Sequence, residues 1–218
     1  MDARPAARHG TPVAALVLAA GAGRRYGRPK ALVEFGGRLL VERAVVTARV
    51  GGCCPVVTVL GAAAEEVRAR ADLAGAMVID NPEWATGLGS SLRAGLAALR
   101  PAGAVAAVVL LVDMPGVTPE AVRRLAGLAA PDALAIAGYG TGRGHPVLLG
   151  RAHWAGVAAS AAGDAGARGY LRERVAQLRV VPCGDVATGG DVDTEADRAS
   201  FPAGGAAGST ASSGGTGG

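Results

Sequence analysis

Short apolar runs alternate with segments of helical periodicity along this chain. Residues 13–19 form a continuous apolar run, too short for a helix and rich enough in β-branched side chains for a buried strand. Similar runs occur at 56–60, 77–79, 105–112, 133–137, 146–149 and 178–181. Apolar residues at helical spacing, or first-turn helix signals, occur between them at 39–50, 62–72, 88–99, 119–129 and 165–177. Because strand–helix–strand units form right-handed crossovers, this alternation predicts an α/β fold, a Rossmann-like three-layer sandwich with a mostly parallel sheet.

The length of 218 residues is enough for one compact domain, which we expect over residues 13–201. Half of the residues are hydrophobic but only 3% are aromatic, so the core must consist of small aliphatic side chains. We expect residues 1–12 to be a flexible N-terminus. Residues 202–218 are almost only Gly, Ala, Ser and Thr, a composition that predicts a disordered tail.

Several function classes are disfavoured by composition. The longest apolar run, 104–112, is too short to span a membrane, and no secretory signal is recognisable, so we expect a cytoplasmic protein. Three cysteines without a Cys-x-x-Cys spacing (Cys53, Cys54 and Cys183) are expected to be small buried thiols. The net charge of +4 comes from arginines scattered among acids, which favours an anionic small molecule over nucleic acid or a membrane as partner.

The loop after the first apolar run has the composition of a phosphate-binding loop. Gly21, Gly23 and Gly27 let backbone N–H groups approach phosphate oxygens, and Lys30 is the only lysine among 22 basic residues. The loop lacks the Gly-Lys-Ser/Thr of a Walker motif, and Tyr26 stands where a dinucleotide fingerprint has glycine. With Arg24, the loop has two cations suited to a triphosphate. The alternative is an ordinary strand–helix turn with solvated arginines.

Two carboxylate positions are candidate metal ligands. Asp113 directly follows the most apolar run, so it should lie at the edge of the sheet where ligands bind. Thr118 already supplies an N-cap for the next helix, which leaves Asp113 free for Mg²⁺. Asp193, with Asp191 close by, is the natural second ligand. The alternative for these two acids is a polar turn near the C-terminus.

Six motifs occur in an order that resembles one enzyme family. They are Leu18-Ala-Ala-Gly-x-Gly-x-Arg-x-Gly-x-Pro-Lys30, Asn81-Pro-x-Trp-x-x-Gly87-x-x-Ser90-Ser91, Asp113-Met-Pro, Gly144-His145-Pro, Gly163-Asp164-x-Gly-Ala-Arg168 and Asp191-x-Asp193-Thr. This set, spread over about residues 13–198, resembles the nucleotidyltransferases that move a nucleotide onto a phosphorylated acceptor. The branch it is most similar to is the molybdenum cofactor cytidylyltransferases, which are MobA-like NTP transferases.

The resemblance implies roles for individual residues. Arg24, Lys30 and Asp113 would be catalytic, Asp113 and Asp193 would bind Mg²⁺, and His145, Asp164, Arg168 and Asp191 would contact the acceptor. The implied nucleotide-binding residues are Leu18, Ala19, Ala20, Gly21, Gly23, Arg24, Lys30, Asn81, Gly87, Ser90, Ser91 and Asp113. Plainer interpretations remain for some of them. Gly87, Ser90 and Ser91 are also typical of a helix N-terminus, and Gly163-Asp164 of a turn; His153 and Trp154 are expected to be packing residues.

The implied reaction is transfer of CMP from CTP to the terminal phosphate of molybdenum-molybdopterin, with release of pyrophosphate. Ala20 stands where guanylyl-transferring relatives tend to have Gly, and the extra methyl favours a pyrimidine. GTP as donor, or a sugar phosphate, methylerythritol phosphate or phospholactate as acceptor, remain alternatives. So does a non-catalytic module that hands the cofactor to a molybdenum hydroxylase. A dehydrogenase is less favoured, because Arg24, Arg28 and Lys30 crowd a loop meant for one pyrophosphate.

Overall fold

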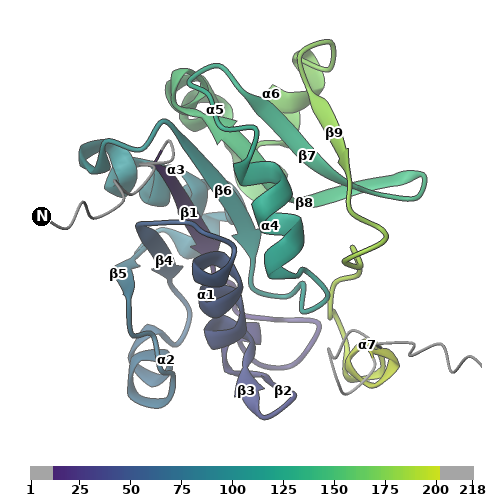
Figure 1. Ribbon diagram of the computed structural model, residues 1–218. Coiled ribbons are helices and arrows are strands. Elements are labelled where there is room, and N and C mark those ends of the chain that lie inside the picture. The colour runs from purple at the N-terminus through teal and green to yellow at the C-terminus, as the bar shows by residue number, and fades with distance from the viewer. Residues whose placement is uncertain (1–11, 202–218) are drawn as a thin grey trace, which may run out of the picture.

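A seven-stranded sheet forms the centre of the protein, which is described by a computed structural model over residues 12–201 (Figure 1). The sheet order is β5-β4-β1-β6-β8-β7-β9. Its strands are β1 (Val13–Leu18), β4 (Val56–Leu60), β5 (Ala76–Asp80), β6 (Ala106–Leu111), β7 (Leu134–Tyr139), β8 (Gly142–Gly150) and β9 (Arg179–Pro182), and β2 (Glu34–Phe35) pairs with β3 (Arg38–Leu39) in a separate hairpin. The expected flexible N-terminus, apart from Pro12, and the expected tail 202–218 lie outside the described residues.

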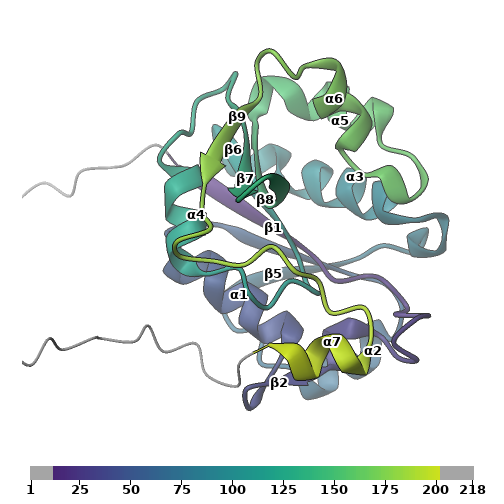
Figure 2. The same cartoon turned by 90° about the vertical axis from the view of Figure 1, so that its right-hand side faces the viewer.

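The sheet is mostly parallel, as predicted. β1 pairs in parallel with β4 and β6, and β8 alone runs against its neighbours β6 and β7. The helices are α1 (Leu40–Val50), α2 (Ala64–Arg70), α3 (Leu88–Leu99), α4 (Pro119–Ala126), α5 (Trp154–Ser160), α6 (Arg168–Glu173) and α7 (Glu195–Ser200). α1 and α4 cover one face of the sheet and α3, α5 and α6 the other, so the predicted three-layer α/β fold is confirmed (Figure 2).

The two faces of the sheet have separate hydrophobic cores. Along β1, Val13, Ala15 and Val17 belong to the core beneath α1 and α4, whereas Ala14, Leu16 and Leu18 face the core beneath α3. All six residues are buried. A strand with both faces covered favours apolar residues at every position, which is why the sequence shows this strand as an unbroken apolar run.

The glycine-rich segment 138–144 differs from the prediction. The apolar runs predict strands over 133–137 and 146–149 with this segment between them, but β7 extends to Tyr139 and β8 begins at Gly142, so the two strands form a tight hairpin. Gly140 takes a positive φ of 60° at the turn. These glycine-rich ends of β7 and β8 are strands because their backbone groups pair with each other. The sequence pattern shows only that glycine lacks a side chain, and it does not show this pairing.

Several helices also differ from their expected bounds. The helix expected over 165–177 is only α6, because Gly166 has a positive φ of 53° and residues before it form a 3₁₀ turn. α5 and α7 were not predicted. Thr118 caps α4 as expected, its side chain accepting a hydrogen bond from the N–H of Ala121. No helix among the described residues is long and apolar enough to cross a membrane.

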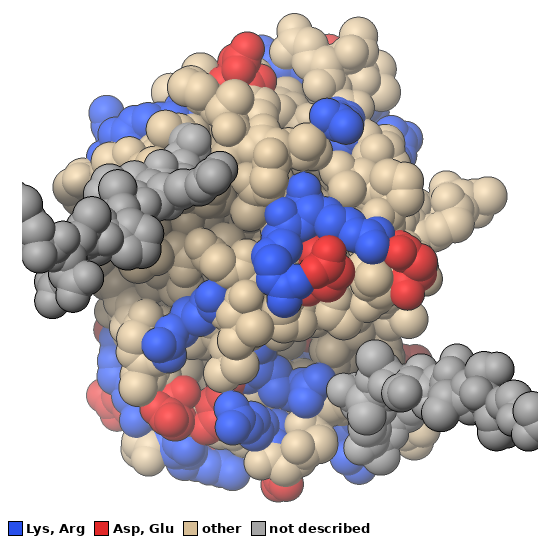
Figure 3. Space-filling model, viewed as in Figure 1, with Lys and Arg blue, Asp and Glu red and all other residues tan. Residues whose placement is uncertain are grey.

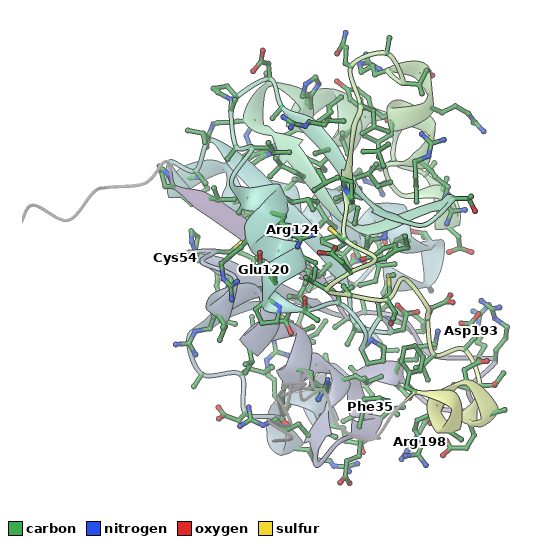
Figure 4. All side chains as sticks on the ribbon, turned by 45° about the vertical axis from the view of Figure 1, so that its right-hand side comes forward. Phe35, Cys54, Glu120, Arg124, Asp193 and Arg198 are labelled. Atoms are coloured by element: carbon green, nitrogen blue, oxygen red, sulfur yellow. The ribbon has the colours of Figure 1, made fainter. Side chains whose placement is uncertain are left out.

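The cysteine prediction is partly wrong. Cys53 and Cys183 are buried, but Cys54 is exposed. It lies before β4, on the opposite side of the molecule from Asp193 (Figure 4). His153 and Trp154 are packing residues as expected. Both are buried, and His153 makes hydrogen bonds through its ring nitrogens to Tyr170 Oη at 2.9 Å and the carbonyl oxygen of Asp132 at 3.0 Å.

Candidate active site

The glycine-rich loop between β1 and Lys30 folds back on itself. Gly23 has a φ of +61°, and a Cβ there would lie 1.9 Å from the carbonyl oxygen of Arg28, so only glycine fits. The N–H of Gly27 closes the turn on the carbonyl oxygen of Gly23 at 2.9 Å. A Cβ at Gly21 would meet nothing within 4 Å. The space above Gly21 is therefore open to a ligand.

This loop forms one wall of a cavity of about 490 Å³ beside the carboxyl ends of β1 and β6. In sheets of this kind, ligands bind at that edge. The cavity is lined by Leu18, Ala20, Gly21, Ala22, Gly23, Arg24, Arg25, Lys30, Trp84, Ala85, Thr86, Gly87, Leu88, Ser91, Leu111, Val112, Asp113, Asp164, Arg168, Asp191 and Asp193. Thirteen of the residues predicted to bind nucleotide, metal or acceptor are thus brought to one place, from five of the six motifs.

Lys30 is the centre of an ion-pair cluster in this cavity. Its Nζ atom lies 2.8 Å from Asp113 Oδ2 and 2.5 Å from Asp193 Oδ1. The Lys30 side chain is only 13% exposed. Burial acts to lower the pKa of Lys30, but the hydrogen bonds to Asp113 and Asp193 outweigh it and raise the pKa above its usual value. Lys30 therefore carries its charge at neutral pH.

A C-terminal strap, residues 183–194, delivers Asp191 and Asp193 to this cluster. Its backbone follows the loop after β6: Thr188 N–H donates to Gly116 at 3.1 Å, and Val192 N–H donates to Asp113 at 2.8 Å. At the start of the strap, Asp185 accepts two hydrogen bonds from Arg124 of α4. The strap thus crosses from one half of the sheet to the other (Figure 2).

The end of the strap is fastened to the glycine-rich loop. Thr194 caps α7, and the first residue of that helix, Glu195, accepts a hydrogen bond from the hydroxyl of Tyr26. Next to α7, the ring of Phe201 packs edge-on against Phe35 at 5.9 Å between centroids. Figure 4 shows Asp193, Arg198 and Phe35 at this end of the molecule. The strap therefore joins the glycine-rich loop to the carboxylates.

Asp113, Asp191 and Asp193 form a carboxylate cluster in which one oxygen from each lies within 4.8 Å of the others. Carboxylate oxygens are the protein ligands that Mg²⁺ and Mn²⁺ prefer, and Mg²⁺ completes its shell with water and phosphate oxygens. Asp191 is exposed and the other two are half-buried, and Lys30 Nζ lies between Asp113 and Asp193. The residues present therefore fit a divalent metal.

The motif that begins at Asn81 forms a hydrogen-bond network at the start of α3. Asn81 is buried, and its Nδ2 atom donates to Ser90 Oγ at 2.8 Å and to Ser91 Oγ at 3.0 Å. Ser90 in turn donates to the carbonyl oxygens of Glu83 and Gly87. Ser91 lines the cavity, whereas Ala19, Asn81 and Ser90 do not. These three shape the start of α3 behind the cavity wall.

The opposite wall contains Asp164 and Arg168. Gly87, before α3, has a φ of +110°, and a Cβ there would lie 2.8 Å from Asp164 Oδ1, so the two walls touch at this glycine. His145 lies just outside the cavity lining, and Tyr139 Oη donates to its carbonyl oxygen at 2.7 Å. Burial, and then the charge of Arg168, lower the pKa of His145 to about 4. His145 is thus neutral at physiological pH and near the Asp164–Arg168 wall.

Sequence reasoning missed Arg25. The prediction placed the loop cation at Arg24, although the arginine in the loop motif counts to position 25. Both arginines line the cavity, but it is Arg25 that contacts the cluster, with Nη1 2.6 Å from Asp193 Oδ2. The motif spacing was the available signal.

This α/β fold, with a glycine-rich loop and a carboxylate cluster lining one cavity at the sheet edge, is that of a nucleotidyltransferase. A model of the MobA-like NTP transferase domain matches residues 15–179, and the chain belongs to this family.

Three comparisons indicate the range of its relatives. The chain is 43% identical to nicotine blue oxidoreductase of Paenarthrobacter nicotinovorans over 84% of its own length and 92% of that protein. It is 32% identical, with a TM-score of 0.74, to the crystal structure of a Mycobacterium sp. strain JC1 homologue of Rv0371c, covering 85% of this chain and 92% of that one. A manganese complex of Mycobacterium tuberculosis Rv0371c matches with 29% identity and a TM-score of 0.66, over 79% and 88% of the two chains.

Proposed function

We propose that this protein transfers CMP from CTP to the terminal phosphate of molybdenum-molybdopterin and releases pyrophosphate. The observation that carries the proposal is the arrangement of Lys30 between Asp113 and Asp193, in the cavity that the open side of Gly21 also lines. A cation, a backbone anion site and metal-ligating carboxylates within one cavity are what transfer between phosphates requires.

The chemistry is an in-line displacement at the α-phosphorus of CTP. An oxygen of the acceptor phosphate forms a bond to that phosphorus, and the bond from the phosphorus to the bridging oxygen of the pyrophosphate breaks. The acceptor phosphate is already anionic, so no strong base is needed. The barrier lies in bringing two anions together and in the charge that develops on the leaving pyrophosphate.

The chain's own residues supply the opposing charges. Backbone N–H groups around Gly21 and Gly23 would hold the β- and γ-phosphates, with Arg24, Arg25 and Lys30 beside them. Arg168, on the opposite wall of the cavity, would hold the acceptor phosphate. The neutral His145 nearby can form a hydrogen bond to the acceptor. The two phosphates would thus meet between the walls.

Asp113 and Asp193, with Asp191 beside them, would hold Mg²⁺. When bound, Mg²⁺ would neutralise charge on the phosphate oxygens during transfer. The manganese complex of the mycobacterial relative supports a divalent metal in this family.

The proposed choice of CTP depends on Ala20. Ala20 is buried, lines the cavity and lies next to Gly61, where an added Cβ would be 2.8 Å from the Ala20 methyl and 2.5 Å from Trp84 Cβ. This corner is closely packed. A methyl group here leaves less room for a purine, worth about 1–3 kcal/mol of discrimination.

A redox reaction is the second candidate, and the 43% identical relative named nicotine blue oxidoreductase favours it. A nicotinamide dinucleotide also carries a pyrophosphate, which the glycine loop could hold. The carboxylate cluster argues for transfer, because hydride transfer from a nicotinamide requires no metal.

One assay separates the candidates. Pyrophosphate release is measured with CTP, GTP, ATP and UTP in turn, with Mg²⁺, in the presence and absence of molybdenum-loaded molybdopterin. NADH and NADPH oxidation is followed in parallel with nicotine blue. Release with CTP that requires the pterin supports the proposal. Release with GTP, or with another phosphorylated acceptor, changes the substrate; dinucleotide oxidation without any pyrophosphate release replaces the proposal with the redox reaction.

A further inference from the structure

We propose that Lys30 is a resident cation that excludes a divalent metal from the carboxylate cluster until a nucleoside triphosphate draws the lysine side chain away. The inference deepens the proposed function, on which it rests for the identity of the triphosphate. It makes Lys30 responsible for the order in which nucleotide and metal bind, in addition to its charge in the reaction.

The first argument is that both carboxylate oxygens of Asp193 already contact a cation. Lys30 Nζ lies 2.5 Å from one oxygen of Asp193, and Arg25 Nη1 lies 2.6 Å from the other. The same Nζ atom lies 2.8 Å from Asp113 Oδ2. The ammonium group therefore occupies the position between the two carboxylates from which one metal ion would contact both.

The second argument is the charge of the cluster. Three carboxylates contribute −3, and Lys30 and Arg25 contribute +2, so the net charge of the group is −1. A divalent cation that entered now would meet a nearby ammonium group in a partly buried place, where repulsion is weakly screened. Without Lys30, the same cluster would have a charge of −2.

The third argument is that the two cations differ in how easily they leave. The Arg25 side chain is 77% exposed, whereas that of Lys30 is 13% exposed. Water can solvate the Arg25 side chain when it leaves Asp193. The largely buried Lys30 ammonium needs another anion as its partner before it can leave the carboxylates. The open space above Gly21 would place a triphosphate within the same loop, and the flexible lysine stem can then turn its charge from the carboxylates to the phosphates.

The first test is a Mn²⁺ titration of the protein without nucleotide, followed by electron paramagnetic resonance. We expect Lys30→Met to bind Mn²⁺ about tenfold or more tightly than the wild type. Arg24→Met is the matched control, because it removes one charge from the same loop and cavity without removing a contact to the cluster; it should change the affinity by less than about threefold. Equal or weaker Mn²⁺ binding by a folded Lys30→Met protein would overturn the proposal.

The second test uses the wild-type protein and does not depend on a variant that folds. Because Lys30 is the only lysine, ¹⁵Nζ-lysine labelling gives one side-chain ammonium signal. Millimolar Mg²⁺ alone should leave this signal in place, and CTP or GTP with Mg²⁺ should shift it. A shift of the ammonium signal with Mg²⁺ alone, or no shift with either nucleotide, would contradict the proposed movement of Lys30 from the carboxylates to the phosphates. The Mn²⁺ titration and the Mg²⁺ measurement require no turnover. Failure of the proposed transfer reaction can therefore be distinguished from failure of this inference.

Discussion

The backbone N–H of Val192 donates to the carbonyl oxygen of Asp113 at 2.8 Å, and the Val192 side chain is completely buried. This contact lies between Asp191 and Asp193 in the strap and ties both to the end of β6. A hydrogen bond between backbones does not depend on the flexible side chains around it. The separation of the carboxylates is therefore set by the fold, and the following predictions concern residues that act around it.

Lys30→Ala and Asp113→Asn should each lower pyrophosphate release by about a hundredfold or more, because each removes a charge that acts on the reacting phosphates. The protein should remain folded by circular dichroism. Steady-state kinetics with the cognate nucleotide make the measurement. Unchanged activity in either variant removes that residue from the mechanism.

Gly21→Ala and Gly23→Ala should separate ligand binding from loop folding. A methyl group at Gly21 meets nothing within 4 Å, so Gly21→Ala should keep the wild-type Tm and weaken nucleotide binding about tenfold or more. At Gly23 the methyl would clash with the carbonyl oxygen of Arg28, so Gly23→Ala should lower both the Tm and the affinity, with a stability cost of about 1–3 kcal/mol. Thermal melts and nucleotide titrations provide the data. Equal affinity of Gly21→Ala and wild type would mean that phosphate does not approach this glycine.

Tyr26→Phe should raise the KM for the nucleotide about fivefold and leave kcat nearly unchanged. The variant loses the hydrogen bond from the Tyr26 hydroxyl to Glu195, worth about 1 kcal/mol between exposed groups, and with it the tie between the glycine-rich loop and the strap; the same hydroxyl also interacts with Arg28. Glu66→Gln, which removes an exposed ion pair to Arg70 in α2, is the control and should have no effect on KM. A Tyr26→Phe enzyme with wild-type kinetics would show that the tie has no part in nucleotide binding.

His145 should make the protein less stable as the pH falls. Its pKa is about 4 in the folded state, because of burial and the charge of Arg168, against about 6.5 in the unfolded chain. Between pH 6.5 and 4 the unfolded state binds a proton that the folded state does not, so the free energy of unfolding decreases as the pH is lowered through this range. We expect His145→Gln to remove about 1–2 kcal/mol of this decrease, after allowance for partial exposure. Urea unfolding of the wild type and the variant at pH 7 and pH 4.5 measures this difference in the free energy of unfolding. An identical pH dependence of the two proteins would contradict the role of His145.

Ala20→Gly should reduce the preference for CTP over GTP by about tenfold, through the space gained beside Gly61 and Trp84. The ratio of kcat/KM for the two nucleotides is the measurement. A lower activity with both nucleotides and an unchanged ratio would separate Ala20 from base choice.

Part of the candidate site was predictable from the sequence, because two of its motifs follow closely after apolar strands. Asp113 after β6 and the loop after β1 had to meet at one sheet edge once the strands were parallel. The positions of Asn81 and Ser90 were not predictable in the same way. Both are polar residues in a ligand-like motif, and only the packing of α3 places them in hydrogen bonds behind the cavity wall. Likewise, Arg24 and Arg25 are adjacent and chemically equal, and the contact with Asp193 distinguishes them.

The sequence by itself determined the α/β class, the strand–helix order and the glycine-rich loop, because each depends on residues close in the chain: unbroken apolar runs for the strands, capping at Thr118, and the turn that only Gly23 can make. The tertiary structure decided the strand pairing of the 138–144 segment and the partner of Lys30. Lys30 and Asp193 are 163 positions apart, and no local pattern relates them. They meet because the strap crosses the sheet edge, held there by long-range backbone hydrogen bonds and by the burial of Val192.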